Sequence, residues 1–518
     1  MSTTLLGDYQ TPLPLVRDVL RAIRMAGARW ARALEPTCGQ GNFIRGLLEL
    51  DDPPREIIGL DIQDGHVRAA SGIEPPPGVR VHVAQADVFA TNLRTALCWE
   101  TRGPLLVVGN PPWLTSAASG ALGGANLPRK SNLKGLAGLE AITGKANFDV
   151  AEFIFIKLVQ ELMHEQPTVA LLCKTSVARS VLRYARTAGW PVLGASLHRV
   201  PAQRWFGASA DACLFTLRVG PGTTDYTAAV YDSLSDPLPC SALGFAGQHL
   251  VPDAAAYEQV AFLDGASPVQ WRQGVKHDAA SVLELAWHDG AWRNTAGEAV
   301  DVEPDCLFPL VKSGDLNAAP GSRPTRAVLL PQTRLGEDTL RLTKLPRTWA
   351  YLQKHADVFA RRRSSIYARQ APFSVFGVGD YTFTRYKVAV SGLHKRGRFA
   401  PIGPREGRPV VCDDACYVLP LRSPAEAALF AAALNHPLTS AFLDSTVFWD
   451  AKRPITKSVL SRVDVAQLVQ HVPWADIVQG AEAALAELSP EDRGNWTSKL
   501  AAARARLEPA THRQLALF

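Results

Sequence analysis

The segment LEPTCGQGNF, residues 34–43, decides the fold class of this 518-residue chain. A short apolar strand ends on Glu35, a turn carrying Gly39 and Gly41 follows, and a helix begins at Asn42. Glycines in such a turn let the backbone approach a ligand closely, and the helix N-terminus offers free N–H groups. A tight strand–helix turn without a ligand is the alternative interpretation of this segment taken alone.

Short apolar strands and helices alternate around this turn, from about residue 13 to residue 220. The patterns predict helices over 13–25, 42–50, 150–163 and 176–188, and strands over 30–35, 56–61, 79–84, 104–108 and 168–173. Such alternation is typical of a parallel sheet with helices on both faces, a Rossmann-like α/β fold. In these sheets ligands bind beyond the carboxyl ends of the strands.

Two acids follow successive strands of the predicted sheet. Asp61 ends the strand EIIGLD, 20 residues after Gly41, where a carboxylate can accept hydrogen bonds from two ribose hydroxyls. Asp87 follows the next strand, where it could accept from the amino group of an adenine ring. The turn begins with Glu35 and Pro36 and lacks the third glycine of the dinucleotide fingerprint, which argues against NAD. A nucleoside cofactor is indicated, although both aspartates could instead be helix N-caps.

The tetrapeptide Asn110-Pro111-Pro112-Trp113 comes just after the apolar strand PLLVV. An aromatic amine is a poor nucleophile because its lone pair is delocalised into the ring. The Asn110 side-chain oxygen and the Pro111 carbonyl can accept its two N–H bonds and so favour a tetrahedral nitrogen aimed at a methyl donor. The prolines fix φ and remove competing N–H groups, so catalysis is mostly orientation.

Trp113 offers a flat face on which a base can stack, a contact worth roughly 1–3 kcal/mol. Chemistry on a base inside a duplex requires that the base leave the stack. The alternative is an Asn-Pro turn with a core tryptophan. No metal and no covalent nucleophile are needed, because a sulfonium methyl donor is already activated.

Composition excludes several classes of protein. The balance of 55 Lys+Arg against 49 Asp+Glu gives a mild net charge of +6, which permits an acidic partner without requiring one. The 8 cysteines are scattered, and Cys412 and Cys416 have no second ligand pair nearby, so neither a disulfide scaffold nor a zinc site is expected. With no signal peptide and no apolar stretch of membrane-spanning length, we expect a soluble, cytoplasmic protein.

These motifs, in this order, resemble the gamma class of N6-adenine DNA methyltransferases of restriction–modification systems. The resemblance covers residues 1 to about 220, and Gln10-Thr11-Pro12 looks like the element that such enzymes fold over the methionine part of S-adenosylmethionine. Two substitutions depart from the common pattern: Glu35 stands where many members carry Asp, and Trp113 where they carry Tyr or Phe. Both keep the chemistry.

The resemblance implies roles for residues of this chain. Cofactor binding would fall on Thr11, Glu35, Pro36, Gly39, Gly41, Asp61, Asp87 and Asn110. The segment NFDVA, residues 147–151, resembles the family's turn into the helix after the catalytic loop. In WFGASADA, residues 205–212, the aromatic that covers the other face of the flipped adenine maps to Phe206, with Trp205 as its competitor.

The strand–helix rhythm is lost near residue 222, so we expect a catalytic domain over 1–222 and a mixed α+β target-recognition domain with C-terminal helices over 223–518. Residues 361–410 are basic and rich in aromatics, which suits phosphate contacts to double-stranded DNA plus groove reading. A solvated basic face is the alternative. The candidate DNA contacts are Arg361, Arg362, Arg363, Arg385, Lys387, Lys395, Arg396, Lys452 and Arg453.

Other functions share parts of this pattern. In protein glutamine N5-methylation the acceptor is a side-chain amide nitrogen, which is also a poor nucleophile and is activated by the same tetrapeptide. Methylation of adenine in RNA and N4-methylation of cytosine use similar geometry. A rival of another class is a DNA-binding subunit that is active only with a partner protein. We find no nuclease motif, so cleavage would belong to a separate restriction endonuclease or defence-system subunit.

Overall fold

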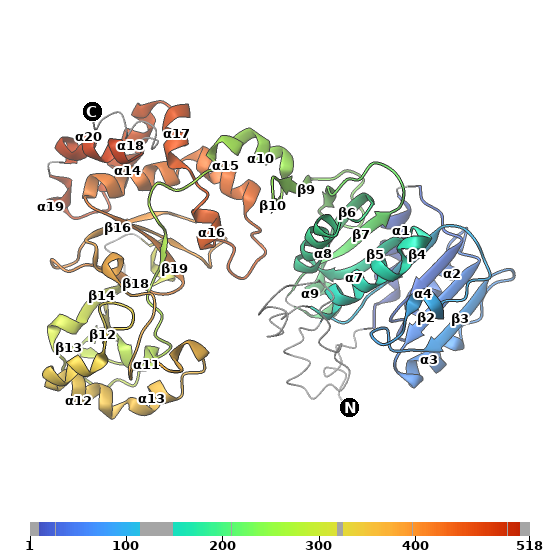
Figure 1. Ribbon diagram of the computed structural model, residues 1–518, viewed down its shortest axis with the longest axis horizontal. Helices are drawn as coiled ribbons and strands as arrows, with labels where there is room; N and C mark the ends of the chain where they lie inside the picture. The colour runs from blue at the N-terminus through green and yellow to red at the C-terminus, as the bar shows by residue number, and fades with distance from the viewer. Residues whose placement is uncertain are drawn as a thin grey trace. The chain divides into compact units, whose positions relative to one another are not determined.

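The computed structural model describes residues 10–25, 27–113, 149–208, 210–318, 325–395, 397–494 and 496–507. The chain divides into two compact units, Met1–Ala255 and Ala256–Phe518. Figure 1 colours the first unit from blue to green and the second from green to red. Among the described residues, no helix combines the length and apolar character needed to span a membrane.

The first unit is built on a ten-stranded sheet in the order β10-β9-β8-β6-β7-β5-β4-β1-β2-β3. Its strands are β1 Arg32–Glu35, β2 Glu56–Asp61, β3 Arg80–Gln85, β4 Leu105–Gly109, β5 Thr168–Lys174, β6 Val192–Pro201, β7 Asp211–Val219, β8 Ala228–Tyr231, β9 Ser241–Ala246 and β10 His249–Val251. Its helices are α1 Leu13–Arg24, α2 Asn42–Leu48, α3 Asp64–Ser71, α4 Leu93–Ala96, α7 Val150–Leu162, α8 Thr175–Thr187 and α9 Ala202–Phe206, with α10 Ala254–Val260 at the division.

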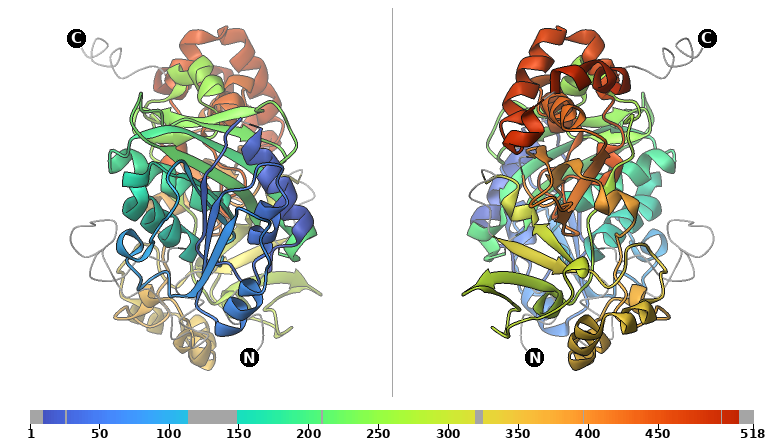
Figure 2. Two further views of the ribbon diagram at one scale, coloured as in Figure 1. Left: turned by 90° about the vertical axis from the view of Figure 1, so that its right-hand side faces the viewer. Right: turned by 90° about the vertical axis from the view of Figure 1, so that its left-hand side faces the viewer.

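The neighbours β5, β4, β1, β2 and β3 all run parallel, and β7 joins them antiparallel to β5. Every residue of β1, β2 and β4 is buried, as expected for parallel strands that helices cover on both faces. Figure 2 (left) shows helices of this unit on both sides of its sheet. The edge strand β3 is largely exposed.

Helix α1 places its buried stripe, which includes Leu15, Val16 and Val19, in a core shared with α2 and the sheet. Helix α7 is buried on nearly every side, and Asp149 caps its N-terminus by accepting from the Ala151 N–H. The predicted fold class is confirmed, and each predicted helix and strand of this region is present with ends shifted by at most a few residues.

The division between the units lies beyond the boundary expected near residue 222. Strand β8 pairs parallel with β6 and β9 pairs with β8, so residues up to Val251 complete the first sheet. The loss of strand–helix rhythm near residue 222 therefore marks a change from covered parallel strands to short, partly exposed strands within one sheet.

The second unit contains two sheets, β11-β19-β16-β17 and β13-β12-β15-β14-β18. Their strands are β11 Arg272–Gln273, β12 Glu284–His288, β13 Ala291–Arg293, β14 Leu307–Val311, β15 Arg326–Leu329, β16 Tyr386–Ser391, β17 Ala400–Ile402, β18 Val411–Cys412 and β19 Cys416–Leu421. The helices are α11 Ala280–Leu283, α12 Pro346–Lys354, α13 Ala356–Ala360, α14 Pro424–Leu434, α15 Pro437–Thr446, α16 Lys457–Leu460, α17 Val465–His471, α18 Trp474–Leu485, α19 Pro490–Arg493 and α20 Trp496–Leu507.

Helix α14 forms the centre of the C-terminal part of the second unit. All its residues are buried, because α17, α18 and α20 pack on it together with β16 and β17. Figure 1 shows these helices gathered at one end of the unit. The mixed α+β class expected for the second domain is confirmed, and its C-terminal part is helical.

Candidate active site

Polar side chains stand at the carboxyl ends of five neighbouring parallel strands. In the order of the sheet they are Lys174 on β5, Asn110 after β4, Glu35 on β1, Asp61 on β2 and Asp87 after β3. Because these strands are parallel, all five ends lie along one edge of the sheet. Residues far apart in the sequence are thereby brought into one row.

The glycine turn after β1 is held by hydrogen bonds to its neighbours. Gly39 N–H donates to Asp61 Oδ2 over 2.9 Å. Gly39 has φ +51°, and a Cβ there would lie 2.6 Å from Gln10 Oε1. Gly41, at φ +82°, is the N-cap of α2. Both positions use conformations that other residues adopt only with strain, which explains the two glycines.

Asp61 is buried and is oriented through both of its oxygens. Its Oδ2 accepts the Gly39 N–H, and its Oδ1 accepts the Gln63 N–H at 2.8 Å. His66 Nδ1 lies 3.3 Å from that Oδ1. A carboxylate offers about four lone-pair positions, of which the two N–H donors fill two and His66, when it donates, fills a third, so at least one position remains for a hydroxyl donor of a ligand.

Glu35 lies beneath the glycine turn and is almost completely buried. Burial raises the pKa of its carboxyl well above the ordinary value, the charge of Asp61 adds to the rise, and a hydrogen bond from the Ile44 backbone opposes it. Glu35 Oε2 and Thr37 Oγ1 are buried with no hydrogen-bond partner among the described residues. Unpaired buried polar atoms are rare and costly, so these two atoms are candidates for contact with a bound ligand or water.

The segment of Gln10 and Thr11 connects the glycine turn with the loop after β4. Gln10 Oε1 accepts the Gln40 N–H at 3.0 Å, and the Thr11 carbonyl accepts from Asn42 Nδ2 at 2.9 Å. Asn110 Nδ2 in turn donates to Thr11 Oγ1 over 3.2 Å. The N-terminal element predicted to lie at the cofactor site therefore lies against both motifs.

The hydrogen bond from Asn110 to Thr11 fixes the carboxamide of Asn110. With Nδ2 engaged by Thr11, Asn110 Oδ1 is a buried acceptor without a partner in the described part of the chain. Pro111 is buried, whereas Pro112 and Trp113 are half-buried. The end of β4 thus carries one buried acceptor that no described residue satisfies.

Two aromatic rings meet beside the Asn110 loop. Trp113 and Phe206 have ring centroids 5.1 Å apart with planes at 73°, an edge-to-face contact. Trp205 has the Arg204 guanidinium 4.9 Å above its ring. The aromatic brought to Trp113 is therefore Phe206, the residue to which the resemblance assigned the second face of the base.

The outcome differs for the remaining site residues. Asp87 Oδ1 accepts the Phe89 N–H at 2.8 Å within a turn, and the next helix, α4, has Asn92 as its N-cap, so Asp87 is not a helix N-cap. Residues 147 and 148 of the NFDVA segment lie outside the described residues. Lys174, which contacts Trp113, was not predicted, because a lone charge at the end of an apolar strand carries no motif.

The predicted DNA contacts of the second unit fall into two groups. Exposed side chains are those of Arg361, Arg363, Arg385, Lys395 and Lys452, of which Arg361 is paired with Asp357. Arg396 lies outside the described residues.

The other group is tied into the unit itself. Lys387 is buried, and its Nζ donates to the Thr382 and Val410 carbonyls at 2.8 and 2.7 Å. Burial lowers its pKa to about 8. Lys387 cannot reach a phosphate from this position, so the expectation of a DNA contact is corrected at this residue.

Arg362 and Arg453 also serve the packing of the second unit. The Arg362 guanidinium lies 3.7 Å from the centroid of the Tyr367 ring and donates to the Ser374 carbonyl at 2.5 Å. Burial lowers its pKa. Arg453 donates to the Asp414 carbonyl at 3.3 Å and lies 3.6 Å from that residue's carboxylate.

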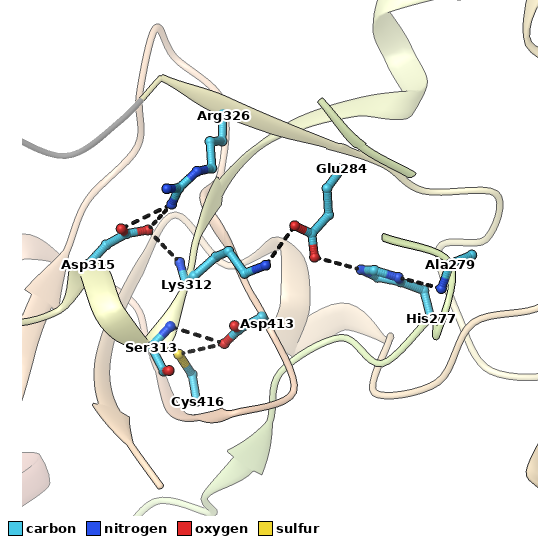
Figure 3. Close-up of polar contacts among 9 residues, drawn as sticks. All are labelled: His277, Ala279, Glu284, Lys312, Ser313, Asp315, Arg326, Asp413 and Cys416. Carbon is cyan, nitrogen blue, oxygen red and sulfur yellow. Dashed lines mark hydrogen bonds and ion pairs between the residues drawn. The ribbon is translucent and has the colours of Figure 1, made fainter. Parts of the chain in front are cut away.

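The segment LVKSGD, residues 310–315, takes part in a network of hydrogen bonds and ion pairs, which Figure 3 shows. Lys312 Nζ donates to Glu284 Oε2 at 2.7 Å, and the other oxygen of Glu284 lies 3.5 Å from His277 Nε2. Arg326 forms an ion pair with Asp315 at 2.8 Å, so strands β12, β14 and β15 are joined by charge. This network stabilises the second unit's own sheet.

Comparisons with known proteins agree with this architecture. No family model matches the chain. It is 33% identical over 467 residues to the Type II methyltransferase M.NspV of Nostoc sp. (strain ATCC 29411 / PCC 7524), an alignment that covers 90% of this chain and 97% of that protein. The fold also resembles the Type IIL restriction-modification enzyme MmeI, solved in complex with DNA, with a TM-score of 0.50 and 12% identity over 98% of this chain and 73% of that one.

Proposed function

The chain belongs to the Type II DNA methyltransferases of restriction–modification systems, and from this membership we propose that it methylates the N6 amine of an adenine flipped out of duplex DNA. The observation that carries the proposal is Asn110 Oδ1, a buried acceptor without a partner among the described residues. The methyl donor of these enzymes is S-adenosylmethionine, whose sulfonium activates the transferred group.

The residues at the sheet edge fit this cofactor. Asp61, the last residue of β2, keeps lone-pair capacity for ribose hydroxyls. Glu35 Oε2 and Thr37 Oγ1 are buried polar atoms without a partner among the described residues. The glycine turn places backbone N–H groups at the start of α2. In the proposal, Thr11, Pro36, Gly39 and Gly41 shape the cavity around the donor, and Asp87 accepts from its adenine amine.

The proposed chemistry is orientation of an amine. Asn110 Oδ1 and the Pro111 carbonyl accept the two N–H bonds of the substrate amine, so that its lone pair points at the methyl donor. Thr11 supports this role because its hydroxyl engages Asn110 Nδ2 and prevents the carboxamide from turning. Holding reacting atoms in line supplies several kcal/mol of a barrier without any covalent intermediate. The proton leaves the nitrogen after transfer.

Trp113 and Phe206 are the proposed partners of the flipped base. Their edge-to-face contact leaves no parallel slot between the rings, so a base that stacks on Trp113 must separate them. Stacking on such a ring is worth roughly 1–3 kcal/mol and compensates in part for lost pairing in the duplex. In the proposal, Phe206 then covers the other face of the adenine.

The second unit is the proposed reader of duplex DNA. The solved complex of MmeI with DNA supports this role by analogy of architecture alone. Among the candidate contacts, the exposed Arg363, Arg385, Lys395 and Lys452 remain available to phosphates.

The test is expression of the wild-type chain and of Asn110→Ala in a bacterial host without methylation of its own, with modified bases mapped by single-molecule sequencing. We expect N6-methyladenine at one short motif with wild type and none with Asn110→Ala. Since the amine then loses one of its two acceptors, the purified variant should be at least about 1,000-fold slower while it still binds S-adenosylmethionine.

Other results would redirect the proposal. N4-methylcytosine at the motif would overturn the choice of base, and methylation of a protein amide would overturn DNA as the substrate. A folded wild-type chain that binds the cofactor yet modifies no base alone, but does so with a co-purifying protein, would establish dependence on a partner.

A further inference from the structure

Trp113, in the loop after β4, forms two hydrogen bonds with residues of the neighbouring strand β5. Its indole Nε1 donates to the Leu172 carbonyl over 3.2 Å, and its backbone carbonyl accepts from Lys174 Nζ over 3.0 Å. Both partners belong to the last three residues of β5, which pairs in parallel with β4. The ring that is proposed to carry the base is therefore attached to the central sheet at both its side chain and its backbone.

Lys174 does more than contact one carbonyl. Its ammonium also donates to Asp149 Oδ2 over 2.6 Å, and Asp149 Oδ1 accepts the Ala151 N–H at the start of α7. The lysine side chain is about one quarter exposed and that of Asp149 about one tenth. One ammonium thus connects the loop after β4, the N-terminus of α7 and the end of β5.

We propose that Lys174 is a positioning residue of the methyl-transfer site, which holds Trp113 and the backbone of Asn110 to Pro112 in the geometry that a stacked base requires. The inference rests on the proposed function only in that a base must stack on Trp113. The charge matters because an ammonium donates to a carboxylate and to a carbonyl at once. Asp149 anchors it on the side away from the loop.

Removal of Lys174 should affect the methylation rate through the position of the loop after β4 more than through the stability of the fold. A displacement of about 1 Å at a reacting group can cost about a hundredfold in rate. Without Lys174 the Trp113 carbonyl loses its donor, while the indole bond to Leu172 and the ring contact with Phe206 remain. The loop should then stay folded, but only the Trp113 side chain and not its backbone is bonded to β5. The ring is therefore less well positioned, and the base should stack on it less well.

The experiment uses the full chain and the recognition site found by sequencing, with three variants: Lys174→Met, which removes the charge at similar length, Lys174→Arg, which keeps it, and Lys157→Met as matched control. Lys157 is a buried lysine of the same unit, paired with Glu161 of its own helix. Each protein is assayed for S-adenosylmethionine affinity, single-turnover methylation rate, and fluorescence of 2-aminopurine at the methylated position.

We expect Lys174→Met to slow single-turnover methylation about 10- to 100-fold, to keep cofactor affinity within about twofold, and to change the 2-aminopurine signal because stacking is weakened. Lys174→Arg should recover most of the rate. Lys157→Met should lower the unfolding temperature and leave rate and signal unchanged.

Wild-type rate and fluorescence in Lys174→Met would overturn the inference. So would a reduction of cofactor affinity that parallels the reduction of rate, because the lysine would then support the whole unit rather than the loop. If the wild-type chain methylates a base other than adenine, the proposed function fails, but the same variants still test whether Lys174 positions Trp113 for that base.

Discussion

In the first unit, Asn110 Oδ1 and Glu35 Oε2 are buried without partners among the described residues, whereas in the second unit the buried cation Lys387 donates to two backbone carbonyls. The unpaired acceptors of the first unit can still bind a ligand. The Lys387 donors of the second unit are already used in hydrogen bonds within the fold. Motifs tied to strand ends predicted positions that converge on one edge. A basic composition predicted only that cations are present and could not say which of them face solvent.

The largest effect should come from the carboxylate that joins the glycine turn to β2. Replacing Asp61 with Ala removes the acceptor of the Gly39 N–H and the proposed acceptor of two ribose hydroxyls. Hydrogen bonds to a charged group are worth about 1.5–3 kcal/mol each, so the affinity for S-adenosylmethionine should fall by about 100- to 10,000-fold. Isothermal titration calorimetry measures this change.

Asp52→Ala is the control for that experiment, because Asp52 is exposed and pairs with Arg29 at the surface. It should leave the affinity within about a factor of two. Affinity of Asp61→Ala within about tenfold of wild type would show that the row of strand-end side chains does not form the cofactor site, and the contrast between the two units would lose its first half.

The second effect concerns the buried cation of the second unit and depends on pH. Burial lowers the Lys387 pKa to about 8, below the ordinary 10.5. Between these values the unfolded chain binds the proton and the folded chain does not, so the free energy of unfolding should rise as pH rises. Relative to Lys387→Met, wild type should gain up to about 3 kcal/mol between about pH 8 and pH 10.5.

Urea unfolding of wild type and Lys387→Met at about pH 7.5 and pH 10 measures this difference, since all other titrating groups are common to both proteins. Lys452→Met serves as control, because Lys452 is exposed and should show no such dependence. If the two stability curves run parallel across the window, the Lys387 pKa is not lowered by burial, and the contrast between the two units loses its support in the second unit.

The sequence predicted the parts of the fold that repeat locally. Strand β4 is a continuous apolar run, β2 has an apolar centre between two acids, and α1 has the spacing of an amphipathic helix, so these elements were recognised. Strands β8 to β10 were not assigned to the first sheet. They are short and only partly buried, and β8 joins through β6, about 30 residues earlier.

The candidate site, like the fold, has features that the sequence predicted and features that it did not. Residue types at strand ends were predictable, since each follows its own strand. The contacts among them were not, because Asn110 meets Thr11 across 99 residues and Lys174 meets Trp113 across 61. Such pairs depend on the order of strands in the sheet, which one sequence does not specify.

The smallest effect should come from the exposed cations of the second unit. Arg363, Arg385 and Lys395 are exposed, and none makes an ion pair within the described part of the chain. The triple alanine variant should weaken DNA binding about tenfold at about 0.1 M salt. The slope of log affinity against log salt should become shallower by about 0.9 for each phosphate that is no longer neutralised, or about 3 in all.

Arg362→Gln is the matched test of the other group, because that guanidinium is bonded to the Ser374 carbonyl and stacked on Tyr367. It should lower the unfolding temperature of the protein and leave the salt slope unchanged. A shallower slope in Arg362→Gln, or an unchanged slope in the triple variant, would show that exposure in the free protein does not identify the phosphate contacts. The second unit would then have to rearrange when it binds DNA, since a cation bonded to its own backbone reaches a phosphate only by releasing that bond.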